Sequence, residues 1–337
     1  MLPGETLELP DLKGQGALAS SPDPAPDVVE MSWRLVGSSL VLVAATTATM
    51  ATPISPTARA TFPGSNGRIA FEREMPAAGH TQTDLFTVRA DGTGVVRLTR
   101  TRSRNELGPS WSPNGSSLAF WRTPAPFGPG SLWVVRGNGS APHRLTGGID
   151  ARDPAWNPAG TRLVFDSDSD LYTLRASDGR DRRVLTSGRA LDFEPAWAPD
   201  GRSIAFSRGF ATGDVGDIYL LNLGTHSVRR VTHSPAYDHQ VAWAPDGRRL
   251  VFERDRSTAS SIFTVRPDGT GLRRVTAGRH FDIGPAYSPD GTVIAFGSDR
   301  REPFFDNLWT IHPDGTRLHR LLRLRFSEGF PDWQPLP

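Results

Sequence analysis

The sequence predicts an all-β protein, a six-bladed β-propeller in which the C-terminal strand completes the first blade. Three observations lead to this prediction. An aromatic motif recurs six times at spacings of 41 to 46 residues, which is the length expected of a four-stranded propeller blade. Each of the first five copies is followed by the same succession of strand-like segments. The two ends of the repeated region also complement each other.

The recurring motif places an aromatic residue before a tight turn, as in Pro109-Ser-Trp111-Ser-Pro-Asn-Gly115. The Asp-Gly and Asn-Gly pairs that close most copies supply the positive φ that tight hairpins require. The six aromatic residues are Trp111, Trp156, Trp197, Trp243, Tyr287 and Trp333.

Three further strands are expected in each unit. An apolar triplet such as Ile69-Ala-Phe71 follows the turn, a third strand carries an aromatic residue such as Phe86, and a short fourth strand ends in a Leu-Thr or Val-Thr step. Alternating β-branched and aromatic residues of this kind are typical of pleated strands with one face against a neighbour.

The ends of the repeated region predict how the ring closes. The first unit, residues 67–99, lacks a strand with the aromatic motif, and the last segment, Pro331 to Pro335, is such a strand with nothing after it. If the C-terminal strand becomes the innermost strand of the first blade, no exposed sheet edge remains.

Residues 1–30 are rich in Pro, Gly and acidic residues without periodicity, so we expect a disordered extension, upstream of the true start if translation begins at Met31. Residues 31–60 combine Arg34, an apolar stretch to Ala45 and small residues up to Ala60, which is typical of a signal peptide. The apolar stretch is shorter than the roughly 20 residues that cross a bilayer. We therefore favour a signal peptide over an uncleaved signal anchor, which would be the sole membrane attachment. The propeller is expected over residues 61–337 of an exported protein, periplasmic or extracellular.

The pattern Pro-x-Trp-Ser-Pro-Asp-Gly, followed by Ile-Ala-Phe, Asp-Ile-Tyr and Arg-Leu-Thr, resembles the WD-like propeller repeat of the TolB family. The resemblance covers essentially all of residues 62–337. It implies a six-bladed propeller that acts in the bacterial envelope by binding protein. TolB proteins also carry an N-terminal α/β domain, and residues 1–60 are too few and too irregular to form it. The resemblance therefore implies the fold more strongly than it implies TolB's partner, peptidoglycan-associated lipoprotein.

Acidic residues recur five positions before the repeat aromatic, where a propeller would gather them around the mouth of its channel. The exception is Ala151, which Asp150 and Asp153 flank. Clustered carboxylates focus a negative potential that attracts cations or basic segments. The candidate ligand-binding residues at the channel mouth are Glu106, Asp153, Asp192, Asp238, His239, Asp282 and Glu328.

The same acids are equally consistent with a structural role. Arg189, Arg279 and Arg325 each precede one of them by three residues, so the repeated step would be a salt-bridged scaffold. A feature that recurs in every blade also favours structure over function. Both interpretations stay open from the sequence.

Three histidines, His233, His239 and His280, are expected on the same face, and Gln240 adjoins His239. Propeller lyases similar to this family bind manganese through several His and a Gln. A metal-dependent lyase acting on acidic polysaccharide fragments is therefore the alternative function. The spacing matches no compact metal motif, so we assign no metal, no cofactor and no catalytic residue.

The favoured function is a non-catalytic, exported binding module for a protein or cell-envelope component, with a cationic segment as the expected ligand. The loops after the apolar triplets, at residues 72–83, 122–130, 207–216 and 297–306, vary most, and Phe127, Phe210 and Phe304 are expected to supply apolar contact area. The absence of cysteine excludes disulfides and a thiol nucleophile, and the absence of Gly-x-Ser-x-Gly argues against a serine hydrolase. A formal charge of +2 gives no indication of nucleic-acid binding, and a monomer is expected.

Overall fold

The structure, a computed structural model, describes residues 34–36, 39–41, 61–77, 80–124, 128–210, 216–256, 258–301, 306–323 and 326–337. The expectations for residues 1–60, namely the extension at residues 1–30, the signal peptide at residues 31–60 and the lack of an α/β domain, concern residues that lie outside these ranges, apart from two short strands. These strands, β1 (Arg34–Val36) and β2 (Ser39–Val41), pair in antiparallel fashion. Within the described ranges, no helix is long and apolar enough to cross a membrane.

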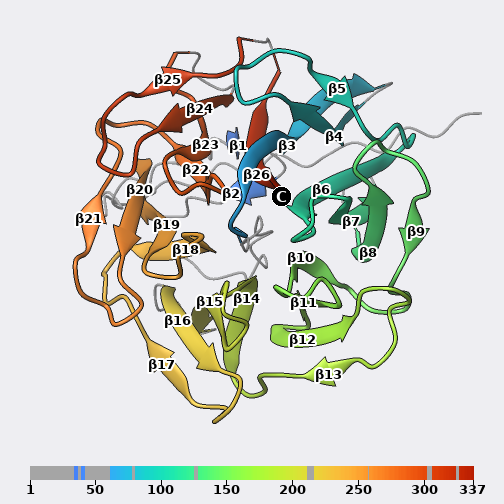
Figure 1. Ribbon diagram of the computed structural model, residues 1–337, viewed down its shortest axis with the longest axis vertical. Helices are drawn as coiled ribbons and strands as arrows, with labels where there is room; N and C mark the ends of the chain where they lie inside the picture. Colours follow the sequence, from blue (N-terminus) through green and yellow to red (C-terminus); the bar gives the residue numbers. More distant parts are fainter. Residues whose placement is uncertain are drawn as a thin grey trace, which may run out of the picture. The chain divides into compact units, whose positions relative to one another are not determined.

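Six antiparallel sheets of four strands follow one another around a ring, and each sheet is one blade (Figure 1). In blades 2 to 6 the strands run in chain order from the inside of the ring outwards. The prediction of a six-bladed propeller is confirmed. Blade 2 contains β6 (Arg104–Trp111), β7 (Ser117–Pro124), β8 (Ser131–Arg136) and β9 (His143–Arg144), and blade 3 contains β10 (Arg152–Trp156), β11 (Arg162–Ser167), β12 (Asp170–Arg175) and β13 (Arg183–Val184).

The remaining blades in chain order repeat this arrangement. Blade 4 contains β14 (Ala190–Trp197), β15 (Ser203–Phe210), β16 (Asp217–Asn222) and β17 (Val228–Arg230). Blade 5 contains β18 (Tyr237–Trp243), β19 (Leu250–Arg256), β20 (Ala259–Val265) and β21 (Arg273–Arg274). Blade 6 contains β22 (Asp282–Tyr287), β23 (Ile294–Ser298), β24 (Asn307–Ile311) and β25 (His319–Arg320).

Blade 1 joins the two ends of the propeller, as the sequence predicts. It contains β26 (Glu328–Leu336), β3 (Ser65–Ala77), β4 (His80–Val88) and β5 (Val96–Arg97), in that order. The C-terminal strand β26 pairs with β3, and Trp333 is the register partner of Ile69. In Figure 1 β26 accordingly lies on the inside of the ring beside β3.

Every inner strand carries a bulge where it pairs with the second strand of its blade. The register shifts just before the repeat aromatic in all six blades, and the residue three positions before that aromatic has a φ between 51° and 63°. A bulge of this kind bends the strand and re-aims the side chain that it carries. The residues at this bulge position are Gly108, Asp153, Glu194, Gln240, Gly284 and Phe330.

The core lies between neighbouring blades. The apolar triplets of the second strands, such as Ile69-Ala70-Phe71, are fully buried, and burial of each large side chain contributes about 1.5–3 kcal/mol. The repeat tryptophans also tie blades together, because the Nε1 of Trp156 donates to the carbonyl oxygen of Ser110 in blade 2 at 3.0 Å. The predicted turn glycines have the positive φ that their hairpins require, as at Gly201 with a φ of 71°.

Candidate functional site

The predicted acids and the variable loops meet at one end of the blades. The backbone N–H of Asp192 donates to the carbonyl oxygen of Ser169, and that of Glu328 donates to Asp306, both at 2.9 Å. In each case the acceptor lies between the second and third strands of the preceding blade. The inner strands therefore begin on the face where the longer loops emerge.

Five of the predicted acids are buried and form ion pairs, at 2.5 to 2.9 Å, with arginines that lie on or just after the second strand of the same blade. In Asp238, for example, the two carboxylate oxygens accept from Nε and Nη2 of Arg254 at 2.5 and 2.7 Å. We call them the acid–arginine pairs. They are Glu106–Arg122, Asp192–Arg208, Asp238–Arg254, Asp282–Arg300 and Glu328–Arg73.

Aromatic rings lie close to the guanidinium groups of these arginines. The guanidinium of Arg254 lies 4.6 Å from the ring centroid of Phe263, and that of Arg122 lies 4.1 Å from Trp133. The partners differ from the arginines that the sequence suggested, since Arg189 and Arg279 are exposed to solvent and Arg325 lies outside the described residues. The recurring pairs favour the structural interpretation, with different arginines.

Burial dominates the electrostatics of these acids. It raises the pKa of both Glu106 and Glu328 to about 7, although each faces an arginine. Burial also raises the pKa of Asp238 and of Asp282. Each of these desolvated carboxylates thus already has an arginine as its cationic partner within the blade.

Blade 3 departs from this pattern. Ala151 and Ser167 stand where the other blades have the acid and its facing residue, and Asp150 instead forms an ion pair with Arg152 at 2.7 Å. Asp153 is 1% exposed, and neither of its carboxylate oxygens has a hydrogen-bond partner among the described residues. Asp153 therefore differs from the other predicted acids.

Three consecutive blades place a hydrogen-bond acceptor at the bulge position, and we call Asp153, Glu194 and Gln240 the bulge acceptor cluster. The Oε1 atoms of Glu194 and Gln240 also lack hydrogen-bond partners among the described residues. The Oε2 of Glu194 accepts from the backbone N–H of Gln240 at 2.6 Å and from the hydroxyl of Ser207 at 2.7 Å. The blades thus hold Glu194 in place through Oε2, while its Oε1 accepts no hydrogen bond from the described residues.

Asp166, on β11, adds a third acidic group to this region, beside Asp153 and Glu194. Its Oδ1 accepts from the backbone N–H of Glu194 at 3.4 Å. Burial, followed by the like charges of Asp166 and Glu194, raises the pKa of Asp153 well above its ordinary value. Burial also raises the pKa of Asp166 to about 7. The carboxyl groups of Asp153 and Asp166 therefore keep their protons to a higher pH than ordinary aspartates do.

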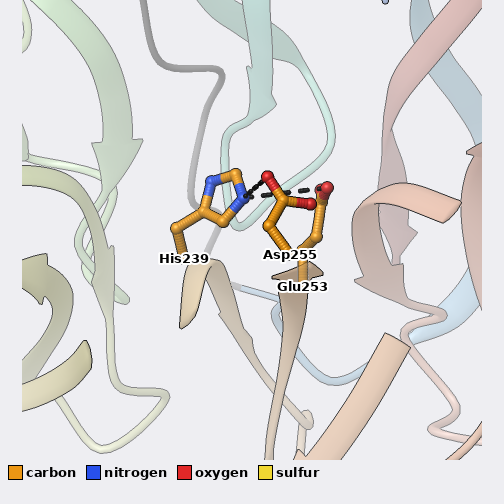
Figure 2. A group of neighbouring side chains, drawn as sticks. All are labelled: His239, Glu253 and Asp255. Carbon is orange, nitrogen blue, oxygen red and sulfur yellow. Dashed lines mark hydrogen bonds and ion pairs between the residues drawn. The ribbon is translucent and has the colours of Figure 1, made fainter. Parts of the chain in front are cut away.

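In blade 5, His239 faces two further carboxylates, Glu253 and Asp255, on β19 (Figure 2). The imidazole Nε2 lies 3.2 Å from Oδ2 of Asp255 and 3.7 Å from Oε1 of Glu253. The other imidazole nitrogen, Nδ1, lies 3.5 Å from Oε1 of Glu194. We call His239, Glu253 and Asp255 the histidine–carboxylate group, and Glu194 links it to the bulge acceptor cluster.

The charges of this group shift its pKa values in a common direction. Burial alone would lower the pKa of His239, but the charges of Glu253, Asp255 and Glu194 outweigh it and raise that pKa well above its ordinary value. Burial and the charge of Asp255 raise the pKa of Glu253.

The structure does not bring the three predicted histidines together, since His233 is exposed and His280 lies 3.9 Å from Asp299.

The bulge positions of blades 6, 1 and 2 carry no acceptor side chain. They hold Gly284, Phe330 and Gly108, and Phe330 packs with Ile283 in an apolar cluster. A Cβ at Gly284 would lie 2.6 Å from Cδ1 of Phe330. The bulge positions thus divide into an acidic half in blades 3 to 5 and an apolar half in blades 6, 1 and 2.

Sequence reasoning found Asp153 and His239 but missed their companions Asp166, Glu194, Glu253 and Asp255. A signal for two of them exists in the alternation Glu253-Arg254-Asp255, which places the two acids on the face opposite the arginine. Glu194 could have been found by comparing the residue three positions before each repeat aromatic.

The fold agrees with known proteins. The family described as TolB beta propeller domain matches residues 210–335. A protein TolB homolog from Chlorobium luteolum is 42% identical over 263 residues, which cover 75% of this chain and 57% of that relative. The match thus spans little more than half of the relative's length.

Solved structures share the architecture at low sequence identity. TolB from Acinetobacter baumannii superposes with a TM-score of 0.67 at 20% identity, over 80% of this chain and 67% of that one. An oligogalacturonate lyase in complex with manganese gives 0.52 at 14% identity, over 77% and 74%. These two likenesses show the fold alone. With the six closed blades and the identity to the TolB homolog, they show that the propeller of this chain is similar to the TolB-like six-bladed β-propellers.

Proposed function

We propose that this protein is an exported, non-catalytic binding module whose bulge acceptor cluster holds a cationic group of a protein or cell-envelope component. The observation that carries the proposal is the set of buried acceptors without donors. Both oxygens of Asp153, one of Glu194 and one of Gln240 have no hydrogen-bond partner among the described residues. Buried polar groups in proteins are normally paired, so such a concentration calls for a ligand that donates.

The backbone supports a functional origin for these side chains. The bulge position has positive φ, which glycine adopts freely and which costs other residues about 1–2 kcal/mol. Blades 2 and 6 use glycine there, whereas blades 3 to 5 use Asp153, Glu194 and Gln240. A side chain that is retained at such a position must contribute something that glycine does not.

The chemistry of the cluster favours a cation. A guanidinium offers five N–H donors and an ammonium offers three, and both would neutralise the carboxylates that burial now destabilises. In a buried site shielded from water, hydrogen bonds that involve a charged group are stronger than those between neutral groups. The alternative lyase function requires an acidic substrate, which Asp153, Asp166 and Glu194 would repel.

The test is a titration with N-acetylarginine methylamide and with the matched citrulline compound, which has the same shape without the charge. We expect the citrulline compound to bind at least about tenfold more weakly, because one charge-assisted hydrogen bond is worth about 1.5–3 kcal/mol. The double variant Asp153→Asn with Glu194→Gln should bind the arginine compound more weakly than the wild type by a similar factor. Asp200→Asn, an identical change at an exposed turn, serves as the control.

Equal binding of the two compounds, or unchanged binding by the folded double variant, would contradict the proposal. Cross-linking in the native envelope fraction then identifies the partner, by comparing the wild type with the same double variant. A partner that both proteins capture equally would place recognition on another surface. Phe127, Phe210 and Phe304, whose side chains lie outside the structural description, are the loop residues to replace in that case.

A further inference from the structure

We propose that His239, Glu253 and Asp255 bind a divalent transition-metal ion, a site that goes beyond the proposed recognition of a cationic group. The ligand atoms are the imidazole Nε2 and one oxygen from each carboxylate, and all three lie within 4.8 Å of one another. Figure 2 shows the imidazole edge directed at both carboxylates.

Strand register explains why these three side chains converge. His239 on β18 and Glu253 on β19 are direct register partners, and Tyr237 is the partner of Asp255. Directly opposed residues in an antiparallel pair lie on the same face, as do residues two apart on one strand. Two neighbouring strands of one rigid blade therefore supply all three ligands.

The separations suit a first-row metal. Metal–ligand bonds of about 2.0–2.2 Å place neighbouring ligand atoms roughly 3.0–3.5 Å apart. Nε2 of His239 lies 3.2 Å from Asp255 and 3.7 Å from Glu253, so small rotations of the Glu253 side chain suffice. Only the Asp255 side chain, which is 22% exposed, reaches solvent to a substantial extent, and it gives an ion a path to the site.

Neighbouring residues orient the three ligand side chains, as hydrogen-bond partners orient the ligands of metal sites in general. Oε2 of Glu253 accepts from the backbone N–H of Gly284 at 3.2 Å. Nδ1 of His239 lies 3.5 Å from Glu194, so the opposite nitrogen is directed at the carboxylates. Carboxylates beside the second nitrogen of a histidine ligand commonly fix its orientation and raise its basicity.

Charge balance also favours a divalent ion. Glu194, Glu253 and Asp255 surround one imidazole, and among the described residues their ion pairs are with His239 and with no arginine. One imidazole with carboxylates suits zinc, manganese, iron or cobalt better than calcium or magnesium, which prefer oxygen ligands alone.

The test uses the whole protein, stripped of metal by a chelator and then titrated with zinc and with cobalt in the absence of any peptide. We expect one equivalent to bind and to raise the melting temperature. Cobalt should develop a visible absorption spectrum that reports nitrogen and oxygen ligands. Calcium at the same concentration should bind at least about tenfold more weakly, in line with the ligand types.

Variants locate the ion. His239→Gln and Asp255→Asn should each weaken zinc binding at least about 100-fold, and Glu194→Gln by about 10–100-fold, as is usual for a residue that orients a ligand. His280→Gln removes a half-exposed histidine of the next blade and should leave zinc affinity unchanged. Circular dichroism confirms that each variant is folded.

Two results would overturn the proposal: a folded wild-type protein that binds no equivalent of zinc or cobalt, or a His239→Gln variant that binds as tightly as the wild type. The group would then be an ion-paired histidine. Because these measurements involve no cationic ligand, the titration with the arginine compound remains an independent test of the proposed function even if no metal binds.

Discussion

Two adjacent register pairs on β18 and β19 show opposite solutions for buried charge. Asp238 meets Arg254 in a two-bond ion pair backed by Phe263, whereas the neighbouring His239 meets Glu253 and Asp255 with no arginine among the described partners. The first arrangement recurs in five blades, and the second occurs in blade 5. Recurrence therefore marks what builds the blade, and the exception marks where charge is left for another purpose.

The same contrast holds around the ring. The bulge position is glycine or Phe330 in the apolar half, and it is Asp153, Glu194 or Gln240 in the acidic half. Natural proteins depart from locally consistent choices mostly at functional sites. A repeat protein makes such departures easy to see, because each blade supplies the reference for the others.

The largest expected effect comes from removing the C-terminal strand, which carries one of the repeated acid–arginine pairs. Deletion of residues 326–337 takes away β26, and with it both the closure of blade 1 and the pair between Glu328 and Arg73. We expect an aggregating protein without a cooperative thermal transition, since β3 would become an exposed edge. Size-exclusion chromatography and a circular-dichroism melt provide the measurement. A protein lacking only Leu336 and Pro337 is the control, and a deletion that melts like it would contradict the closure.

A single acid–arginine pair should have a smaller but clear effect. Arg254→Leu leaves Asp238 buried without its partner, which we expect to lower the free energy of unfolding by about 3–5 kcal/mol in urea titrations. Replacing both residues, with Asp238→Leu and Arg254→Met, should recover much of this loss because no buried charge remains. A loss below about 1 kcal/mol for Arg254→Leu would mean that the repeated pairs are not the scaffold.

The fold could be predicted from sequence because its signals are local and repeated. The aromatic motif, the apolar triplets and the turn glycines each act within a few residues, and the two incomplete ends left a single way to close the ring. The pairing of Trp333 with Ile69 follows from that complementarity.

The site could be predicted only in part, because its contacts depend on register between strands. The arginines that pair with the acids lie on or just after the second strand of each blade, and the bulge changes which residues face each other. Arg122 rather than a neighbour in sequence therefore meets Glu106. His239 was visible as a single residue, but its partners Glu253 and Asp255 follow only once β18 and β19 are aligned. The contact of Glu194 with Gln240 joins two blades, so it follows only once both inner strands are placed.

The smallest expected effect is a change in stability whose sign differs between the two kinds of buried acid, Asp153 and the acids of the acid–arginine pairs. Asp153 lies among Asp166, Glu194 and Arg152, and burial together with the like charges raises its pKa well above the ordinary value, while the pKa of Asp166 rises to about 7. In the folded protein these groups keep protons that the unfolded chain releases near pH 4. Their contribution to stability is therefore complete below about pH 4 and is lost as pH rises towards 7 and above.

Asp153→Asn removes one of these like charges and suits the positive φ of 51° at this position, since asparagine tolerates that conformation. We expect the variant to be more stable than the wild type by about 0.5–2 kcal/mol at pH 8, in the range typical of stabilising substitutions, with a much smaller difference at pH 5. Urea titrations at the two pH values measure it. Loss of stability at pH 8, as for an acid–arginine pair, would show that the Asp153 carboxylate already has a partner within the protein. If the Asp153 carboxylate has no partner, it opposes folding until a cation binds to it. The arginine compound should therefore stabilise the wild type but not Asp153→Asn.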